Sequence, residues 1–407
     1  MRVSRIAGVV WLAAALSVAG CGGSSDPSGP GGRNPDLSDA RPYDAGSPYA
    51  ADLIGCVDVT VEPRSCSVGR LPPIAWRAPE PSVETVLERV VISHDWMGAR
   101  FEEILRRLPA DLLAVLGAAT AIVIDDDVRP SFYWSLTGAI YVDARHLWLT
   151  PEEEATVTDR QDYRSGFGSD LAFRPFSGYL EGGVPAIPAS AGPTRDLEGR
   201  VRALGALLFH EGAHANDFMP PDRLDSIDGT EPFEEATARL EGARLSRRLA
   251  NANRLASGVW LGLARVLYGG EQASPSQREL SAADAGQEFA PDGASDPYAY
   301  SSQQEDLAML FEETMLKLHF DFDRWVGFAS VPSEPGAECR DYVVGWGTDG
   351  RIGAPSVAPR ARLVAELVLG DSLDDFFASL DPPTPLTPGA NLCIEAPVSP
   401  ASVFRWM

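Results

Sequence analysis

Two histidines near the middle of the chain constrain its fold more than any other feature. They lie in the run Phe-His-Glu-Gly-Ala-His at residues 209–214. Residues 203–209 are apolar apart from one glycine, which predicts a helix buried inside a domain. Residues four apart on a helix lie on the same face, one turn from each other. His210 and His214 are therefore expected to point at the same place.

Histidines with this spacing around a glutamate are typical of a catalytic zinc site. Each imidazole can contribute a ring nitrogen to one ion, and Glu211 projects from a neighbouring face, where it can act on zinc-bound water as a general base. A chance match on a surface helix is the ordinary alternative. A closed structural zinc site is disfavoured, because such sites usually contain cysteine ligands and no cysteine lies nearby. We therefore expect a catalytic zinc ion at His210 and His214.

A catalytic zinc ion usually has three protein ligands, and two places in the sequence can supply the third. Glu234 lies 20 residues after His214 (234 minus 214), with Glu235 beside it. This spacing is similar to that of thermolysin-like enzymes. However, Phe233 and Ala238 stand where those enzymes carry an asparagine and an aspartate.

The second place is the run Tyr-Ala-Tyr-Ser-Ser-Gln-Gln-Glu-Asp-Leu-Ala-Met-Leu-Phe at residues 298–311. It resembles the pattern Y-x6-E-x-x-A-x-x-F of zinc metallopeptidases of the lethal-factor type. The resemblance implies that Glu305 is the third zinc ligand and that Tyr298 assists catalysis, with Tyr300 as its rival. The alternative for Glu305 is a capping box with Ser302, which would only close the first turn of a helix.

The first motif agrees with the same family, because residues 210–217 have its H-E-x-x-H-x-x-D form. Asp217 would then either orient a ligand histidine or begin the exit from the helix. The chain departs from the family at Met309, where relatives often carry a second glutamate, which leaves Asp306 or Glu312 to fill that role. The resemblance spans two short blocks. It implies an α+β fold, namely a zincin-like metallopeptidase domain of the gluzincin type, mostly helical with a small mixed sheet.

The elements before the motif helix follow an order similar to the upper half of zincins. A helical pattern at residues 96–108 precedes strand-like runs at 121–124 and 138–143. In zincins an edge strand above the metal receives an extended substrate by β-augmentation, and residues 132–142 are expected to supply that edge. The three aspartates at 125–127 are expected to form a turn after a strand, with a calcium site as the alternative.

The remaining segments around the motif carry less information. Residues 159–193 contain many glycines and prolines, which predicts a long loop that shapes the cleft, acts as a lid or is a plain insertion. Two helices are expected after the motif helix, at about 231–255 and 257–268. His146 and His319 are interpreted as surface or structural histidines rather than ligands.

The start of the chain is expected to lie outside the folded domain. Residues 1–20 combine two arginines, an apolar stretch and small residues before Cys21, which resembles a bacterial lipoprotein signal peptide; an ordinary secretory signal is the alternative. Residues 21–49 predict a flexible tether. A lipid on Cys21 would anchor the protein to a membrane of the bacterial cell envelope, the outer membrane being favoured. Residues 50–407 are expected to form the metallopeptidase-like domain, with 320–407 as a candidate C-terminal appendage.

Cysteines and charge set further limits. Four cysteines follow Cys21, and an even number in an exported protein favours two disulfides. Of the three pairings we favour Cys56–Cys66 and Cys339–Cys393, because each closes a local loop. The formal net charge of −24 and the lack of a basic stripe argue against nucleic acid as a partner.

These features together predict a membrane-tethered, zinc-dependent metallopeptidase that acts on a peptide or protein. With the family resemblance, His210, His214 and Glu305 would hold Zn2+, Glu211 would act as general base, and Tyr298 would face the substrate oxyanion. The alternative is an envelope lipoprotein that retains a zincin fold as a non-catalytic binding or structural module.

Overall fold

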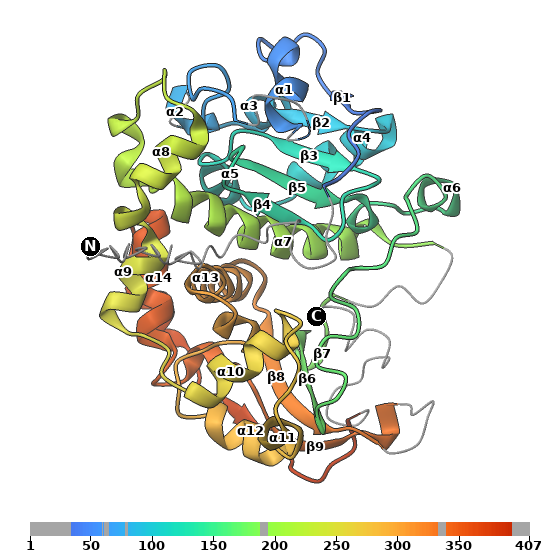
Figure 1. Ribbon diagram of the computed structural model, residues 1–407, viewed down its shortest axis with the longest axis vertical. Helices are drawn as coiled ribbons and strands as arrows, with labels where there is room; N and C mark the ends of the chain where they lie inside the picture. Colours follow the sequence, from blue (N-terminus) through green and yellow to red (C-terminus); the bar gives the residue numbers. More distant parts are fainter. Residues whose placement is uncertain are drawn as a thin grey trace, which may run out of the picture.

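The structure is a computed structural model, and it describes residues 34–58, 60, 65–77, 80–187, 194–332 and 339–392. The expected signal peptide and Cys21 lie outside these ranges. The fold is α+β, with helices surrounding two five-stranded sheets. One sheet lies in the upper half of Figure 1 and the other in the lower half, with two long helices between them. Among the helices of the described ranges, none has the length and apolar character needed to cross a membrane.

The upper sheet is mixed and ends in an antiparallel edge strand. Its strands are β1 (Arg41–Pro42), β2 (Val90–Ile92), β3 (Ile122–Asp125), β4 (Phe132–Trp134) and β5 (Ala139–Asp143). They follow the order β1-β2-β3-β5-β4, in which β2, β3 and β5 are parallel. The central strands are buried on both faces, which explains their runs of valine and isoleucine. The expected edge strand is confirmed at β4, which pairs only with β5 among the described strands.

Alternate residues of these strands enter two different cores. Ile122 and Ile124 of β3 pack with the helices on the side of the active motif, whereas Val123 packs on the opposite face. The period of two along a strand accounts for this division. The helices that precede the motif helix are α1 (Ala50–Val57), α2 (Ile74–Arg77), α3 (Val83–Leu87), α4 (Asp95–Leu105), α5 (Asp111–Leu116) and α6 (Pro151–Glu154).

The expected motif helix is α7 (Leu197–Phe218), which lies below the upper sheet (Figure 1). It begins after Asp196, whose carboxylate accepts the Gly199 amide hydrogen at 2.6 Å. It ends just before Pro220, which cannot continue a helix. Gly212 allows a close approach between helices, because an added Cβ would lie 2.5 Å from Cγ1 of Val115 on α5.

The lower sheet is antiparallel throughout. Its order is β10-β9-β8-β6-β7, and its strands are β6 (Phe173–Glu181), β7 (Val184–Pro185), β8 (Asp323–Ser330), β9 (Val343–Asp349) and β10 (Thr384–Pro385). The expectation of an unbroken loop over 159–193 is therefore wrong for 173–185. Residues of β6 pair along the whole length of β8, and this distant pairing outweighs the local effect of the glycines and prolines.

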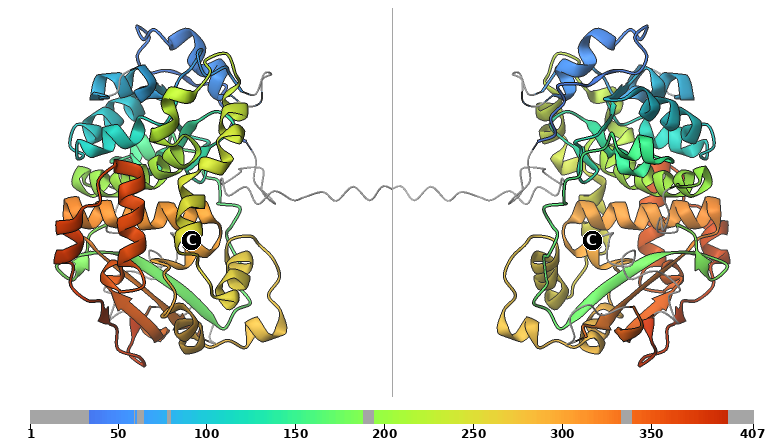
Figure 2. Two further views of the ribbon diagram at one scale, coloured as in Figure 1. Left: turned by 90° about the vertical axis from the view of Figure 1, so that its left-hand side faces the viewer. Right: turned by 90° about the vertical axis from the view of Figure 1, so that its right-hand side faces the viewer.

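Helix α13 (Gln303–Phe320) crosses α7 between the two halves of the molecule. It is seen nearly end on in Figure 1 and along its length in Figure 2. The rings of Phe209 on α7 and Phe311 on α13 pack with their centroids 6.2 Å apart. Helix α14 (Ala358–Leu369) joins the same hydrophobic core, so this part of residues 320–407 packs directly against the elements that carry the motif.

Two further expectations need correction. The single helix expected at about 231–255 is broken into α8 (Phe233–Arg239) and α9 (Leu245–Ala252). Residues 34–49, expected to belong to a flexible tether, lie against the upper sheet, where Arg41–Pro42 pairs with β2. The other helices are α10 (Gly258–Leu267), which agrees with the expected helix at 257–268, α11 (Pro275–Arg278), α12 (Ala282–Phe289) and α15 (Asp374–Ser379).

The predicted disulfide between Cys56 and Cys66 is present. It joins the end of α1 to the segment before α2 and lies in the hydrophobic cluster on the outer face of the upper sheet. The predicted Cys339–Cys393 pairing lies outside the described side chains.

Candidate metal centre

Helices α7 and α13 bring two imidazoles and one carboxylate to a single point. His210 and His214 lie one turn apart on α7, and Glu305 lies in the first turn of α13. One carboxylate oxygen of Glu305 is 3.1 Å from Nε2 of His210 and 3.4 Å from Nε2 of His214. The three ligand atoms lie within 4.8 Å of one another. In the part of the chain that the structure describes, this is the one group of its kind that could hold a metal ion.

The local sequence explains why Glu305 is free to face the histidines. The Ser302 hydroxyl accepts the Glu305 amide hydrogen at 3.0 Å and so starts α13 as an N-cap. The capping-box alternative requires the Glu305 carboxylate to return to the Ser302 backbone. Instead, that carboxylate reaches across to His210 and His214.

Hydrogen bonds and charges within the group shift the pKa values of His210 and Glu305 in opposite directions. Burial opposes charge on His210, but hydrogen bonds to Glu305 and Glu312 outweigh it and hold the pKa of His210 well above its usual value. Burial likewise favours a neutral Glu305, but His214 and His210 hold the pKa of this carboxyl well below its usual range. A metal ion would replace the imidazole proton, because a ligand histidine must be neutral.

Glu211 lies beside the three ligand atoms without joining them. It is 4 % exposed, and its Oε2 atom is buried with no hydrogen-bond partner in the described structure. Burial raises the pKa of Glu211, while the nearby His210 and His214 and the backbone amide of Tyr133 oppose this change. Tyr133 belongs to the edge strand β4, so Glu211 lies close both to the histidines and to that strand.

The structure separates the two candidate tyrosines. The ring of Tyr298 lies over that of His210, with the centroids 6.5 Å apart, and burial raises the pKa of its phenol well above the usual value. Tyr300 points away from the histidines. Its hydroxyl donates to Asp292 at 2.9 Å and its ring stacks on Trp260.

Three carboxylates were candidates for supporting a ligand histidine, and one of them contacts it. Glu312 accepts a hydrogen bond from Nδ1 of His210 at 3.0 Å. Asp217 instead accepts hydrogen bonds from the backbone amide and hydroxyl of Ser246, at 2.6 and 2.8 Å. Asp306 forms a buried ion pair with Arg360.

The other metal-ligand candidates lie apart from this point. Glu234 and Glu235 are exposed in the first turn of α8. The three aspartates at the end of β3 form a turn, as expected, in which Asp125 accepts the Asp127 amide hydrogen at 2.9 Å. Arg160 pairs with Asp127 at 3.3 Å. These aspartates form no metal-ligand group within the described residues.

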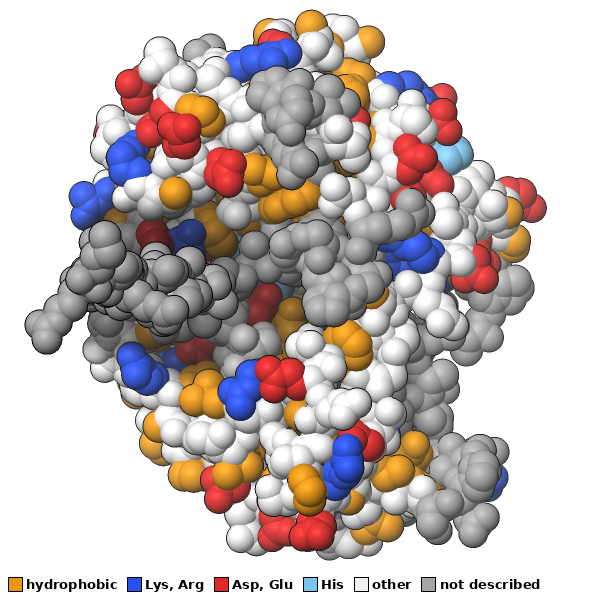
Figure 3. Space-filling view, viewed as in Figure 1, with side chains coloured by type: hydrophobic (Ala, Val, Ile, Leu, Met, Phe, Trp, Pro, Cys, Tyr) orange, Lys and Arg blue, Asp and Glu red, His pale blue; other side chains and the backbone are white. Residues whose placement is uncertain are grey.

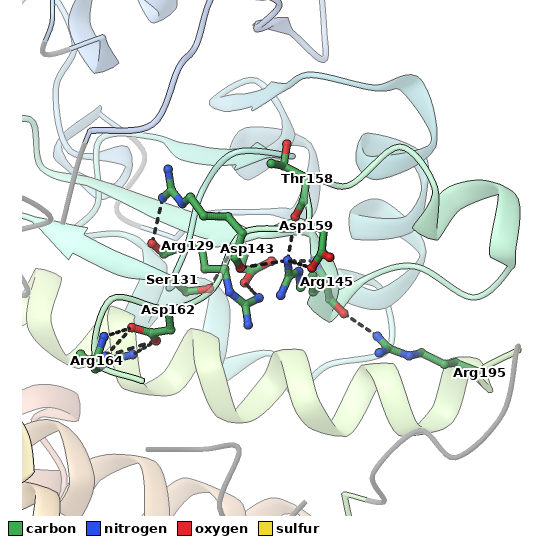
Figure 4. Close-up of polar contacts among 10 residues, drawn as sticks. Arg129, Ser131, Asp143, Arg145, Thr158, Asp159, Asp162, Arg164 and Arg195 are labelled. Carbon is green, nitrogen blue, oxygen red and sulfur yellow. Dashed lines mark hydrogen bonds and ion pairs between the residues drawn. The ribbon is translucent and has the colours of Figure 1, made fainter. Parts of the chain in front are cut away.

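A polar segment, residues 145–164, follows the upper sheet and leads to the region of the candidate site. Figure 4 shows Arg145 contacting the carbonyl of Thr158 and the carboxylate of Asp159, and Arg164 contacting Asp162. The charge of Arg164 acts on the Tyr298 phenol and partly offsets the effect of burial on its pKa. Figure 3 shows a hollow between the upper and lower halves of the molecule, in which acidic side chains are visible.

The sequence did not indicate three residues that contact this centre indirectly, namely Tyr179, Arg324 and Asp296. The Tyr179 hydroxyl donates to Glu312 at 2.7 Å, and Arg324 donates to the Tyr179 oxygen at 2.7 Å. Arg324 also forms an ion pair with Asp296 at 3.2 Å. The partners of Tyr179 are 133 and 145 residues away, so no local spacing could have indicated them.

No protein-family model, curated protein sequence or solved structure matches this chain. The interpretation of the site therefore depends on its own residues and their geometry.

Proposed function

We propose that this chain is a zinc-dependent metallopeptidase. The observation that carries the proposal is the convergence of His210, His214 and Glu305 on one buried point, although His210 and Glu305 are 95 residues apart in sequence. Glu211, beside that point, supplies the one further group that a hydrolytic zinc site requires.

The donor set suits zinc better than the other common divalent ions. Two imidazole nitrogens and one carboxylate oxygen are the ligands of several catalytic zinc sites, whereas calcium and magnesium prefer oxygen ligands alone. Ligand atoms bound tetrahedrally at about 2.0–2.2 Å from zinc lie about 3.4 Å apart. The observed distances from Glu305 Oε2 to the two Nε2 atoms, 3.1 and 3.4 Å, are close to that value.

The residues of the site have distinct roles in this proposal. His210, His214 and Glu305 hold the ion, and bound zinc supplies the Lewis acidity that activates water and polarises a peptide carbonyl. Glu211 accepts the proton from the attacking water and passes it to the leaving nitrogen. The protonated phenol of Tyr298 donates a hydrogen bond to the developing oxyanion.

The edge strand β4 gives the proposed substrate a place to bind. An extended peptide can pair with an open strand edge through backbone hydrogen bonds. The backbone of Tyr133 in β4 is close enough to Glu211 to influence its pKa. A peptide paired with β4 would therefore pass the proposed general base.

The location of the protein in the cell is part of the same proposal. The expected signal peptide and lipidated Cys21 would tether the domain to a membrane of the cell envelope, with the outer membrane favoured. Metabolic labelling with a fatty-acid analogue tests this proposal, because label should enter the wild-type chain and be lost in Cys21→Ser.

The function is tested by pairing metal content with hydrolysis. Wild-type protein should bind about one zinc ion per chain and cleave labelled casein, and a chelator should abolish cleavage. Glu211→Gln should keep the zinc but lose roughly 100- to 10,000-fold of the hydrolysis rate. Full zinc occupancy without cleavage of any protein tested would contradict the peptidase proposal and favour the non-catalytic binding module. Unchanged cleavage by Glu211→Gln would contradict the role of Glu211.

A further inference from the structure

A chain of buried polar groups runs from His210 into the lower sheet. Nδ1 of His210 meets one carboxylate oxygen of Glu312 at 3.0 Å, and the Tyr179 hydroxyl meets the other at 2.7 Å. Nη1 of Arg324 contacts the Tyr179 oxygen at 2.7 Å and forms an ion pair at 3.6 Å with the same Glu312 oxygen that Tyr179 meets. Tyr179 lies on β6, Glu312 on α13 and Arg324 on β8, so three elements distant in sequence form one path.

Arg324, at the end of this path, determines which group donates in each of its hydrogen bonds. A guanidinium can only donate, so Arg324 must donate to the Tyr179 oxygen. Tyr179 then has its single hydroxyl hydrogen left for Glu312. A carboxylate held in this way accepts from His210, which requires the hydrogen on Nδ1. Nε2 of His210 is thereby left as the atom that faces Glu305, as a metal ligand requires.

A second branch from Arg324 reaches the turn that carries Tyr298. Nη2 of Arg324 forms an ion pair with one carboxylate oxygen of Asp296 at 3.2 Å. The other oxygen of Asp296 accepts the Tyr298 amide hydrogen at 2.8 Å and caps the short helix Pro297–Tyr300. Arg324 therefore contacts two separate supports of the candidate site.

Because Arg324, Asp296 and Glu312 are buried, each charged group needs a partner of opposite charge. Arg324, Asp296 and Glu312 are 6, 5 and 9 % exposed. Without a cation, the two buried carboxylates would repel each other and lose their solvation. Arg324 compensates both of them from one planar group, whose several donors point in fixed directions.

We propose that Arg324 is a positioning residue of the metal centre. Through Tyr179 and Glu312 it fixes the orientation of the ligand His210, and through Asp296 it fixes the backbone of Tyr298. The inference rests on the proposed function, because it assigns to Arg324 the alignment of a ligand with a substrate-facing group. Arg324 itself touches neither the ligand point nor Glu211 within the described contacts.

Three variants test the two branches separately. Tyr179→Phe removes the hydroxyl that links Arg324 to Glu312, and it leaves the direct Arg324–Glu312 ion pair and the Asp296 branch in place. Arg324→Met removes both branches, and Arg324→Lys restores the charge without the planar set of donors. Tyr141→Phe is the matched control, because its buried hydroxyl donates to the Val57 carbonyl at 2.7 Å in the upper sheet, away from the path.

The primary measurements are zinc affinity, by competition with a chromogenic chelator, and the visible spectrum of the cobalt-substituted protein. Loss of a partner that orients a metal ligand typically costs 10- to 100-fold in affinity. We expect about a 10-fold loss in Tyr179→Phe, a larger loss in Arg324→Met and partial rescue in Arg324→Lys. The cobalt spectrum should shift in the same order. On labelled casein, kcat should fall in Arg324→Met while KM changes little.

The outcomes separate this inference from the proposed function. Folded Tyr179→Phe and Arg324→Lys with wild-type zinc affinity and cobalt spectrum would overturn the inference, even if wild-type protein cleaves casein. Those two variants decide the question if Arg324→Met does not fold. Zinc binding that weakens as expected in a protein without peptidase activity would support the inference and contradict the proposed function. A Tyr141→Phe variant that weakens zinc binding as much as Tyr179→Phe would overturn the inference, because a general loss of packing would then explain both.

Discussion

Replacing Asp125 by asparagine tests how burial of a carboxyl group in the upper sheet controls stability. Asp125 is 1 % exposed at the end of β3, and burial raises its pKa from 3.8 to about 7. Its Oδ1 accepts the Asp127 amide hydrogen at 2.9 Å, whereas its Oδ2 is buried without a hydrogen-bond partner. Asparagine keeps the size and the acceptor but cannot ionise.

The magnitude follows from the difference in proton affinity between the folded and unfolded states. A carboxyl group whose pKa is raised on folding stabilises the folded state fully below pH 3.8, and this stability is lost as the pH rises to about 7. A rise in pKa from 3.8 to about 7 corresponds to about 4 kcal/mol in total. About 3 kcal/mol of this falls between roughly pH 5 and pH 8.5.

Urea denaturation followed by tryptophan fluorescence provides the measurement. Between pH 5 and pH 8.5, the free energy of unfolding of the wild type should fall by about 3 kcal/mol more than that of Asp125→Asn. The two proteins should show the same dependence on urea concentration, so that the difference reports the ionisation alone. Parallel pH profiles for the two proteins would refute the reasoning. Stabilisation of the wild type by calcium, absent in the variant, would instead support a calcium site at these aspartates.

Further predictions concern catalysis and stability. Tyr298→Phe should lower kcat about 100-fold with little change in KM, because in this proposal the phenol contacts the oxyanion only as it develops. A rise in KM as large as the fall in kcat would contradict this role. Asp306→Leu should destabilise the protein by about 3–5 kcal/mol in urea denaturation, because it leaves Arg360 buried without its partner, and the double variant with Arg360→Met should recover much of the loss. Replacing Cys56 and Cys66 by alanine should cost about 2–3 kcal/mol, and a reducing agent should have the same effect on the wild type; no change would show that the crosslink does not contribute to stability.

The ligand-bearing helix was predictable because its information is local. The spacing of His210 and His214 and the apolar run before them indicate a buried helix, and α7 has both properties. The third ligand needed more than spacing, since Glu305 occupies an N-terminal helix position that a capping role would also explain. The structure brings its carboxylate to the histidines, and the exposed Glu234 and Glu235 lie elsewhere.

The segments that sequence reasoning missed depend on distant partners. Strand β6 forms in a stretch rich in glycine and proline because β8 pairs with it residue by residue. The expected helix at about 231–255 is broken, and its second part, α9, is held to α7 by Asp217, which accepts the backbone amide and hydroxyl hydrogens of Ser246. Both contacts join residues that no window of local sequence contains, so periodicity could not indicate them.

The central claim is that one zinc ion is held by two histidines of α7 and a glutamate of α13. Zinc titration of the wild type and Glu305→Ala, with bound metal measured by atomic spectroscopy, tests it most directly. We expect about one zinc ion per wild-type chain and a dissociation constant at least about 100-fold higher in Glu305→Ala. Zinc affinity that is equal in the two proteins, or a folded wild-type chain that binds no zinc, would contradict the account.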